Sequence, residues 1–336
     1  MKIKKRKSRQ SVVFLIIAEI FLLVVILVGT NSLFSNNKHK DPVINSPTPP
    51  IHASDIRKGA VTSTPKEYIE NTEMLSSQLI PNLASQNAIL ICLEDQQILL
   101  DKDSEATIYP ASLTKIMTAL VAIESLEDLS QSIQLPSEMF DALYEENASM
   151  AGFLPEETVT ALDLLYGVLL PSGAECCIGL ANYISGSEES FVTMMNEKAD
   201  SLDMKNTHFT NSTGLHNKEH YSTVKDLASL LEYALQNASF REIFTAARHS
   251  TGATKLHPEG ITFNSTLFKN MISPDFNGGS ILGGKTGYTS KAGLCLASLA
   301  IKDNKEYILV TAGANGNHST EPFHILDAIY VYSSLK

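Results

Sequence analysis

The stretch YPASLTKIMTAL, residues 109–120, sets Ser112 three positions ahead of Lys115 at the start of a helical pattern. Residues three apart lie on one face of a helix, so the hydroxyl and the amine can come within hydrogen-bonding distance. A serine placed in this way can act as a nucleophile that is activated by a lysine instead of a histidine. The pattern S-x-x-K is not specific by itself, because it also begins at Ser35, Ser63, Ser222 and Ser333. The assignment therefore depends on the rest of the chain.

Strand-forming segments lie near both ends of the region that follows the N-terminus. Residues 87–103, NAILICLEDQQILLDKD, and residues 292–315, AGLCLASLAIKDNKEYILVTAGAN, each contain two apolar runs around a polar turn, which predicts two hairpins. Helical patterns fill most of the chain between and after them: Thr114 to Leu126, Ala161 to Ile184, Glu188 to Leu202, Thr223 to Leu235 with Asn237 as a stop signal, and Phe323 to Tyr332. This arrangement predicts one α+β unit whose sheet is built from both ends of the chain.

Two further motifs follow Ser112. The stretch LLPSGAECC, residues 169–177, places Ser172 at the start of a helix, and GGKTGYTSKAG, residues 283–293, contains a single K-T-G at Lys285, where a strand is expected to begin. This order of motifs resembles that of the penicillin-binding proteins and serine β-lactamases. Within that superfamily, the chain is most similar to the low-molecular-weight D-alanyl-D-alanine carboxypeptidases.

The resemblance covers the chain from about Ala88 to its end and includes the phrases ASLTKIMTAL, FVTMMNEKADSLDMKNTHFTNSTGLH and YSTVKDLA. It implies a DD-peptidase/β-lactamase-like fold, in which a helical lobe packs on a five-stranded antiparallel sheet and the active site lies between them. It also implies a serine carboxypeptidase that removes the terminal D-alanine from peptidoglycan stem pentapeptides. The same resemblance implies that β-lactam antibiotics acylate Ser112 as inhibitors, and that no cofactor is required.

The residues themselves indicate how such a site would work. Ser112 would attack a carbonyl carbon, and Lys115 would accept the serine proton if the amine were neutral. A lysine at its ordinary pKa of about 10.4 is a poor base at neutral pH, so we expect burial and a nearby Lys285 cation to lower the pKa of Lys115. Ser172, at its own helix start, could relay a proton to the leaving amine.

The K-T-G segment is expected to bind substrate along a strand edge. Lys285 and Thr286 would bind the terminal carboxylate of the substrate, and Gly287 would let the substrate backbone approach, since glycine has no Cβ. The resemblance implies that the developing oxyanion is bound by the backbone N–H groups of Ser112 and Tyr288. The expected substrate-binding residues are Lys285, Thr286, Gly287, Tyr288 and Thr289.

The chain departs from the family pattern at two places. The usual second motif is S-x-N, but residue 174 is Ala174, so the amide that would bind the substrate carbonyl and contact the lysine is missing. In addition, no basic residue lies in TAGANGNHST, residues 311–320, where such enzymes often have a carboxylate-binding cation. The effect of Ala174 on activity is left open by the sequence.

The N-terminus predicts a membrane anchor. Residues 1–10 carry six Lys or Arg and no acid, and residues 11–30 form a nearly apolar run. About 20 such residues span a bilayer, and the basic flank predicts a cytoplasmic N-terminus with the remainder on the extracytoplasmic side of the cell membrane. A cleaved signal peptide is the alternative, but its apolar region is usually about 7–15 residues long. Residues 31–66 read as a polar, disordered linker, and residues 67–336 as the catalytic domain.

Charge and potential metal ligands exclude other classes of function. The formal net charge is −11, which argues against nucleic acid as a partner because such a partner requires a basic surface. His216 and His220 are four apart in HNKEH but lack the Glu that follows the first His in zinc peptidases, so we expect loop histidines and no metal. The four cysteines have no metal-ligand spacing and are expected to be free thiols, with a Cys92–Cys295 disulfide as the alternative.

Two other functions remain open at this point. A serine β-lactamase would use the same acylation step followed by rapid deacylation, but the Glu-Asn loop of class A enzymes is not visible between Ser172 and Lys285. A weakly catalytic cell-wall or β-lactam sensor would explain the missing amide at Ala174. The first alternative differs from a carboxypeptidase in its deacylation rate, and the second differs in its acylation rate.

Overall fold

The computed structural model of the chain describes residues 69–70, 77 and 79–335. The predicted basic flank, membrane anchor and linker lie outside these residues, as does the exact start of the catalytic domain. Within the described part of the chain, no helix is both long enough and apolar enough to cross a membrane.

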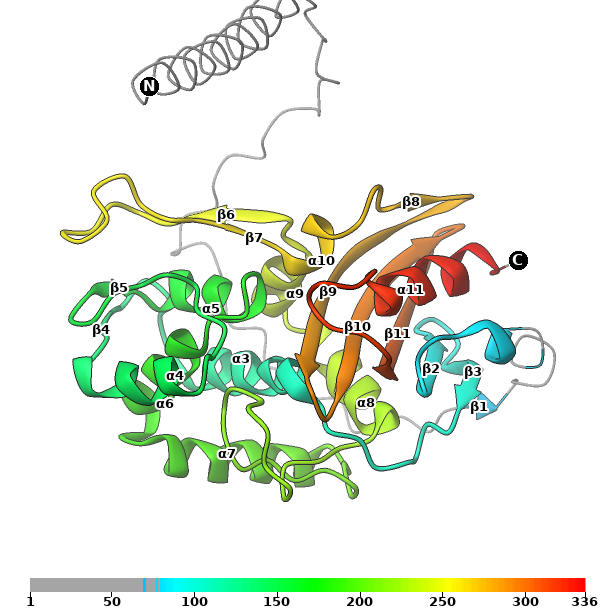
Figure 1. The fold of residues 1–336 in the computed structure, drawn as a ribbon, viewed down its shortest axis with the longest axis horizontal. Helices are drawn as coiled ribbons and strands as arrows, with labels where there is room; N and C mark the ends of the chain where they lie inside the picture. Colours follow the sequence, from blue (N-terminus) through cyan, green and yellow to red (C-terminus); the bar gives the residue numbers. More distant parts are fainter. Residues whose placement is uncertain (1–68, 71–76, 78, 336) are drawn as a thin grey trace, which may run out of the picture. The chain divides into compact units, whose positions relative to one another are not determined.

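The central element is a mixed sheet of seven strands in the order β1-β3-β2-β11-β10-β9-β8 (Figure 1). Each of the five longer strands runs antiparallel to its neighbours among them, and these strands come from both ends of the described chain. They are β2 (Asn87–Cys92), β3 (Gln97–Lys102), β9 (Gly279–Thr289), β10 (Gly293–Lys302) and β11 (Lys305–Ala314). Both predicted hairpins are therefore present, as β2–β3 and β10–β11.

The expected number of five strands is wrong for the whole sheet. Two strands of two residues each extend its edges, and β1 (Ile69–Glu70) pairs parallel to β3 while β8 (Asp275–Phe276) pairs antiparallel to β9. Two residues are too few to produce the alternating pattern by which a strand is recognised in sequence. Two further antiparallel pairs lie outside this sheet: β4 (Ser132–Gln134) with β5 (Thr158–Thr160), and β6 (Arg248–Ser250) with β7 (Thr262–Asn264).

Both faces of the sheet are covered, which explains why β2, β10 and β11 are mostly apolar. On β2, Ile89 and Ile91 pack into the core beneath the helices, whereas Leu90 and Cys92 pack into a second core beneath α11 (Phe323–Ser333). Helix α11 lies against β10 and β11 on this second face (Figure 1).

The other helices form the larger core, except α10 (Thr266–Lys269), whose buried Leu267 packs into the second core with α11. They are α3 (Thr114–Ser125), α4 (Phe140–Glu145), α5 (Ala161–Leu169), α6 (Ala174–Ser185), α7 (Glu188–Ser201), α8 (Val224–Leu235), α9 (Ala238–Thr245) and α10, with single 3-10 turns at Ile80–Asn82, Ala111–Leu113 and Ser137–Met139. Helix α3 contacts α5, α6, α7, α8 and α9, while α8 also lies on β11 and β2. Helix α3 is buried among these neighbours, so its N-terminus is held in a fixed position next to the sheet.

Three boundaries differ from the sequence expectation. The pattern from Ala161 to Ile184 is two helices, because residues 170–173 interrupt it and include Pro171. Asn237 does not stop α8 but starts α9, since its side chain accepts a hydrogen bond from the N–H of Phe240. Strand β9 begins at Gly279, so the K-T-G motif lies in its second half and not at its start.

The four cysteines are free and buried, as expected. Cys92 packs into the core beneath α11 and Cys295 into the core beneath the helices, so the two thiols face opposite sides of the sheet. Strand β11 also separates their strands. A disulfide between Cys92 and Cys295 is therefore excluded.

Candidate active site

Ser112 lies in the 3-10 turn Ala111–Leu113, directly before α3; this segment is called the nucleophile turn below. Ala111 has φ +48, and the left-handed region costs a non-glycine residue roughly 1–2 kcal/mol. Two glycines clamp this turn. A Cβ on Gly214, whose φ is +79, would lie 2.0 Å from the carbonyl oxygen of Ala111, and a Cβ on Gly287 would lie 3.1 Å from the amide nitrogen of Ser112. The turn is therefore wedged between the loop at Gly214 and strand β9.

Gly287 lines the cleft, and the sequence predicts that its missing Cβ makes room for substrate. The structure adds a second close neighbour, the backbone of the nucleophile turn. The contact places the strand backbone at Gly287, and so the start of Tyr288, beside the amide nitrogen of Ser112.

Lys115 lies on the first turn of α3 and is only 2% exposed. Its Nζ donates to Ser112 Oγ at 3.4 Å and to the carbonyl oxygen of Thr213 at 2.5 Å. Burial lowers the pKa of Lys115, against smaller opposing effects of Cys177 and Glu175. The thiol of Cys177 exerts little negative charge, because burial raises its own pKa to about 12. The amine next to Ser112 is thus biased toward its neutral form.

Lys285 is also buried, and its Nζ donates to the carbonyl oxygen of Thr286 at 2.8 Å. Burial, and secondly the neighbouring Lys115, hold the pKa of Lys285 well below its usual range. Burial thus favours the neutral form of both lysines.

Thr286 and Ser172 both line the cleft next to Ser112. The hydroxyl of Thr286 is hydrogen-bonded to that of Thr266 at 2.7 Å. Ser172 has φ +73 in the bend before α6, and its buried Oγ has no hydrogen-bond partner among the residues that the structure describes. An unpaired buried hydroxyl typically costs about 1–3 kcal/mol, and this one is free to bond a substrate or a water molecule.

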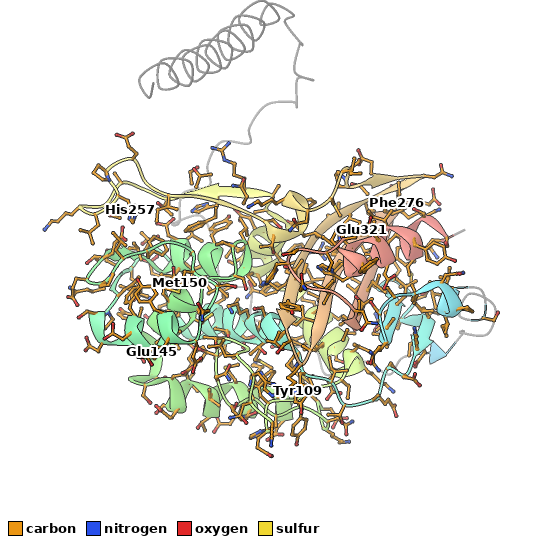
Figure 2. The ribbon with its side chains drawn as sticks, in the orientation of Figure 1. Tyr109, Glu145, Met150, His257, Phe276 and Glu321 are labelled. Carbon is orange, nitrogen blue, oxygen red and sulfur yellow. The ribbon has the colours of Figure 1, made fainter. Side chains whose placement is uncertain are left out.

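The cleft has two halves that meet at Ser112. One half continues past Ser172 and Thr286, and the other past Lys115 and Thr289. Four residues line both halves: Ser112, Ser149, Tyr288 and His318. Figure 2 labels Tyr109, which precedes the nucleophile turn, and Glu145 and Met150, which flank the segment containing Ser149. Ser112 can therefore be reached from both halves of the cleft, as is required when a substrate extends on both sides of the bond that is attacked.

Several residues of this cleft were not predicted from the sequence. Thr213 supplies the carbonyl that holds Lys115, Ser149 and His318 line both halves, and the ring of His318 meets that of Tyr288 edge-on, with centroids 4.8 Å apart. Thr213 lies within the phrase that carries the family resemblance, NSTGLH, so its position could have been noted. No pattern marks Ser149 or His318, because each reaches the cleft from a loop.

The two histidines of HNKEH do not form a pair. The Nδ1 of His220 accepts from the N–H of Thr210 at 3.1 Å, so its Nε2 carries the proton that is donated to Thr114 Oγ1 at 2.8 Å. Burial lowers the pKa of His220 to about 4, and the ring of His216 packs edge-on against Tyr109. In the part of the chain that is described, no group of three or more His, Cys, Asp or Glu is placed to hold a metal ion.

Another S-x-x-K pair that the structure describes is not a site of this kind. Ser222 is buried and hydrogen-bonded to the hydroxyl of Thr207, whereas the Nζ of Lys225 pairs with Glu105 at 2.6 Å. The two side chains are committed to different partners, so Lys225 cannot serve Ser222 as a base.

Comparisons with a family model and with curated relatives both point to D-alanyl-D-alanine carboxypeptidases. Residues 73–316 match the peptidase family S11, described as D-alanyl-D-alanine carboxypeptidase. The chain is 33% identical to D-alanyl-D-alanine carboxypeptidase DacF of Bacillus subtilis, over 76% of this chain and 63% of the relative. It is 30% identical to DacD of Escherichia coli, over 72% of this chain and 61% of the relative. The chain thus spans less than two thirds of the length of these curated relatives.

A solved structure is similar over a larger share of its own length. The DD-transpeptidase of Streptomyces K15 superposes with a TM-score of 0.67 at 26% identity, covering 75% of this chain and 97% of that chain.

Proposed function

Since the chain belongs to the S11 family of D-alanyl-D-alanine carboxypeptidases, we propose that it is a serine carboxypeptidase that removes the terminal D-alanine from peptidoglycan stem pentapeptides. The observation that carries the proposal is the pair formed by Ser112 and Lys115. The amine is buried, its pKa is lowered, and its Nζ lies 3.4 Å from the serine oxygen. A neutral lysine at this distance can take the proton of the attacking hydroxyl.

The proposed reaction has two stages. Ser112 Oγ attacks the carbonyl carbon of the penultimate D-alanine while its proton passes to Lys115, and the oxyanion is bound by the backbone N–H groups of Ser112 and Tyr288. The C–N bond then breaks as the proton is returned, through Ser172, to the amine of the departing D-alanine. In the second stage, water adds to the ester carbonyl, the bond to Ser112 Oγ breaks, and the serine proton is restored.

The K-T-G segment supplies the proposed contacts to substrate. Thr286, Tyr288 and Thr289 line the cleft, so their polar groups can meet the peptide and its terminal carboxylate. Gly287 keeps the strand against the nucleophile turn. Lys285 is assigned an indirect role, because it is buried and its Nζ is bound to the Thr286 carbonyl oxygen.

β-Lactam antibiotics are the expected inhibitors, and the cell membrane is the expected location. A β-lactam would acylate Ser112 by the same attack, with its ring nitrogen as the leaving group. The basic and apolar N-terminal residues 1–30 support a membrane anchor that leaves the catalytic domain on the extracytoplasmic side. Nothing in the acidic composition supports a nucleic-acid partner.

The test uses full-length protein in detergent. Incubation with a diacyl-D-Ala-D-Ala peptide, in the presence and absence of EDTA, is followed by an assay of free D-alanine, and a fluorescent penicillin adduct is followed over time in parallel. We expect D-alanine release that EDTA does not affect, together with a long-lived adduct. An adduct that decays rapidly, without D-alanine release, would identify a β-lactamase.

Ala174 favours a second candidate, the weakly catalytic sensor, because an amide is missing at this position. The sensor would show neither D-alanine release nor acylation on the timescale of a carboxypeptidase. The two time courses therefore separate all three functions.

A further inference from the structure

The start of helix α6 is tied to a loop that lines the cleft. Ala174, the first residue of α6, is 1% exposed, and its N–H donates to the carbonyl oxygen of Ser149 at 2.7 Å. Ser149 belongs to the segment of residues 147–152, which lies between α4 and β5 and is called the 147–152 loop below. The backbone hydrogen bond makes Ser149 a direct neighbour of residue 174.

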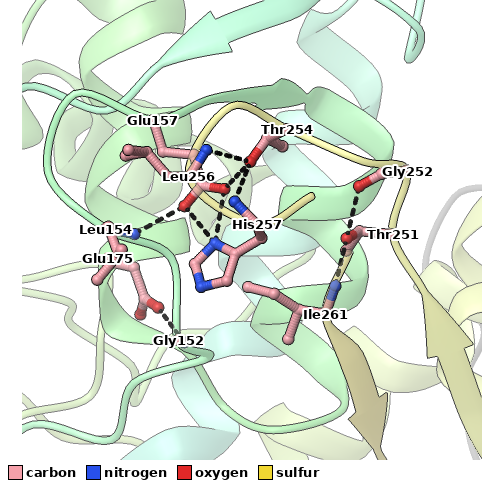
Figure 3. A network of polar contacts seen from close by, with 10 residues as sticks. All are labelled: Gly152, Leu154, Glu157, Glu175, Thr251, Gly252, Thr254, Leu256, His257 and Ile261. Carbon is pink, nitrogen blue, oxygen red and sulfur yellow. Dashed lines mark hydrogen bonds and ion pairs between the residues drawn. The ribbon is translucent and has the colours of Figure 1, made fainter. Parts of the chain in front are cut away.

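Glu175 and Gly173 fix this loop further. The fully buried carboxylate of Glu175 accepts the N–H groups of Ala151 at 2.7 Å and Gly152 at 2.8 Å, and the bond to Gly152 is visible in Figure 3. A Cβ on Gly173 would lie 2.7 Å from the Cβ of Ala151. Gly173, Ala174 and Glu175 thus hold the 147–152 loop at Ser149 and at the two residues Ala151 and Gly152 that follow it closely.

Ser149 is placed to contact a substrate. Its side chain is exposed and lines both halves of the cleft together with Ser112, and its hydroxyl bonds to none of the residues that the structure describes. Asn147, on the same loop, is a weaker candidate. It lines only one half, and its amide already points at the carbonyl oxygen of Glu145, 3.5 Å away.

We propose that Ser149 is a substrate-binding residue that supplies the hydrogen bond for which residue 174 has no side chain. Its hydroxyl donates to the backbone carbonyl that precedes the scissile amide of the peptide, or to the equivalent acylamino carbonyl of a penicillin. Glu175 is the positioning residue, because it fixes the loop that presents Ser149. The inference rests on the proposed function and names a contact within that site.

The test is a double-mutant cycle in full-length protein, with Ser149→Ala, Ala174→Asn and the combination. For each variant, kcat/KM on diacyl-D-Ala-D-Ala and the second-order rate of acylation by fluorescent penicillin are measured. Ser149→Ala should lower both by about tenfold, the effect of one hydrogen bond. Ala174→Asn should change the wild type little but restore most of the loss in the Ser149→Ala background. Ser201→Ala, at an exposed serine on α7 away from the cleft, is the matched control and should leave both rates unchanged.

A Ser149→Ala variant with wild-type rates would overturn the inference. So would an Ala174→Asn change that has the same effect in both backgrounds, since the two side chains would then not share one role. Failure of the proposed function has a different signature: the wild type would release no D-alanine. The penicillin rates then decide the role of Ser149 by themselves.

Discussion

Lys115 can act as a base because of where its amine lies. It is 2% exposed, and its Nζ is held by the carbonyl oxygen of Thr213 next to the hydroxyl of Ser112. Burial penalises the charged form of an amine, so the residue loses its proton at a lower pH than a lysine in water. The hydrogen bond to the Thr213 carbonyl oxygen keeps the amine close to the nucleophile.

This environment predicts how acylation depends on pH. Below its depressed pKa, Lys115 is protonated and cannot accept the serine proton; above it, the amine is neutral, so the acylation rate should rise with pH. We expect the midpoint of the rise to lie below the ordinary lysine value of about 10.4. The measurement is the rate of penicillin acylation across the pH range in which the protein stays folded.

Lys115→Met is the control for that profile. Methionine fills the buried position with an apolar side chain of similar length but has no amine. The variant should therefore acylate about 10²–10⁴-fold more slowly, the usual contribution of a general base, and its acylation rate should not rise with pH. A wild-type profile without any rise would refute the assignment of Lys115.

Ser172 is the second residue on the proposed proton path. Its unpaired buried Oγ predicts that Ser172→Ala lowers kcat/KM for the peptide by about 10²–10⁴-fold, far more than Ala174→Asn changes it. The backbone at Ser172 has φ +73, so Ser172→Gly is measured beside it to separate strain from loss of the hydroxyl. Both variants should be impaired; a fully active Ser172→Gly would assign the effect to the backbone instead.

At the residue scale, the sequence predicts the nucleophile and its base but not all of the residues that surround them. Ser112 and Lys115 are neighbours because helix geometry fixes residues three apart. Ser149 could not be predicted, since its position depends on a hydrogen bond to Ala174 from a loop that is distant in sequence. The contact of the Lys285 Nζ with the Thr286 carbonyl oxygen depends in the same way on tertiary packing.

At the element scale, the nucleophile turn is held by the backbone of two other segments. The contact with Gly214 is the closer one. We expect Gly214→Ala to displace the turn, because the new Cβ would overlap the Ala111 carbonyl oxygen, and to cost about 1–2 kcal/mol in unfolding free energy from its positive φ alone. The acylation rate of Gly214→Ala should fall at least tenfold.

Gly186→Ala separates the cost of a positive φ from the effect of the contact with the nucleophile turn. Gly186 has φ +81, close to that of Gly214, but no atom lies within 4 Å of the position its Cβ would take. Thermal unfolding should show a loss of stability in both variants, while only Gly214→Ala should lose acylation activity. Equal loss of activity in the two would mean that the contact with the nucleophile turn has no specific role.

Two boundaries that the sequence mispredicts have separate physical causes. The sequence predicts a strand start at the K-T-G motif because Gly279, Gly283 and Gly284 weaken the strand signal, although the structure needs them: a Cβ on Gly283 would lie 2.5 Å from the Phe244 carbonyl oxygen. The pattern from Ala161 to Ile184 hides the break at residues 170–173 because apolar residues continue the helical period on both sides. In β9, close packing of backbones thus requires residues that local propensity disfavours.

At the scale of the whole molecule, the sheet joins the two ends of the described chain. Strand β2 pairs with β11, so residues 87–92 and 307–312 lie side by side (Figure 1). This architecture was predictable because two hairpin patterns flank a helical middle. The two added edge strands were not, since pairing over two residues is decided by the neighbouring strands.

This arrangement predicts that the N-terminal 30 residues are dispensable for catalysis. Among the residues that the structure describes, those that line the cleft and those that form the sheet lie after the predicted linker. A protein that lacks residues 1–30 should therefore be soluble without detergent, with the acylation rate of the full-length chain. Partition between membrane and soluble fractions, followed by the penicillin assay, tests this; an insoluble or inactive product would show that these residues belong to the catalytic unit.

The central claim is that Ser112 forms the acyl-enzyme. The most direct measurement is intact mass after incubation with a penicillin, followed by digestion and identification of the acylated peptide, for the wild type, Ser112→Ala and Ser222→Ala. We predict one added penicillin mass on the peptide that contains Ser112, its complete absence in Ser112→Ala, and an unchanged adduct in Ser222→Ala. An adduct that persists in Ser112→Ala, or that maps to another residue in the wild type, would contradict the account.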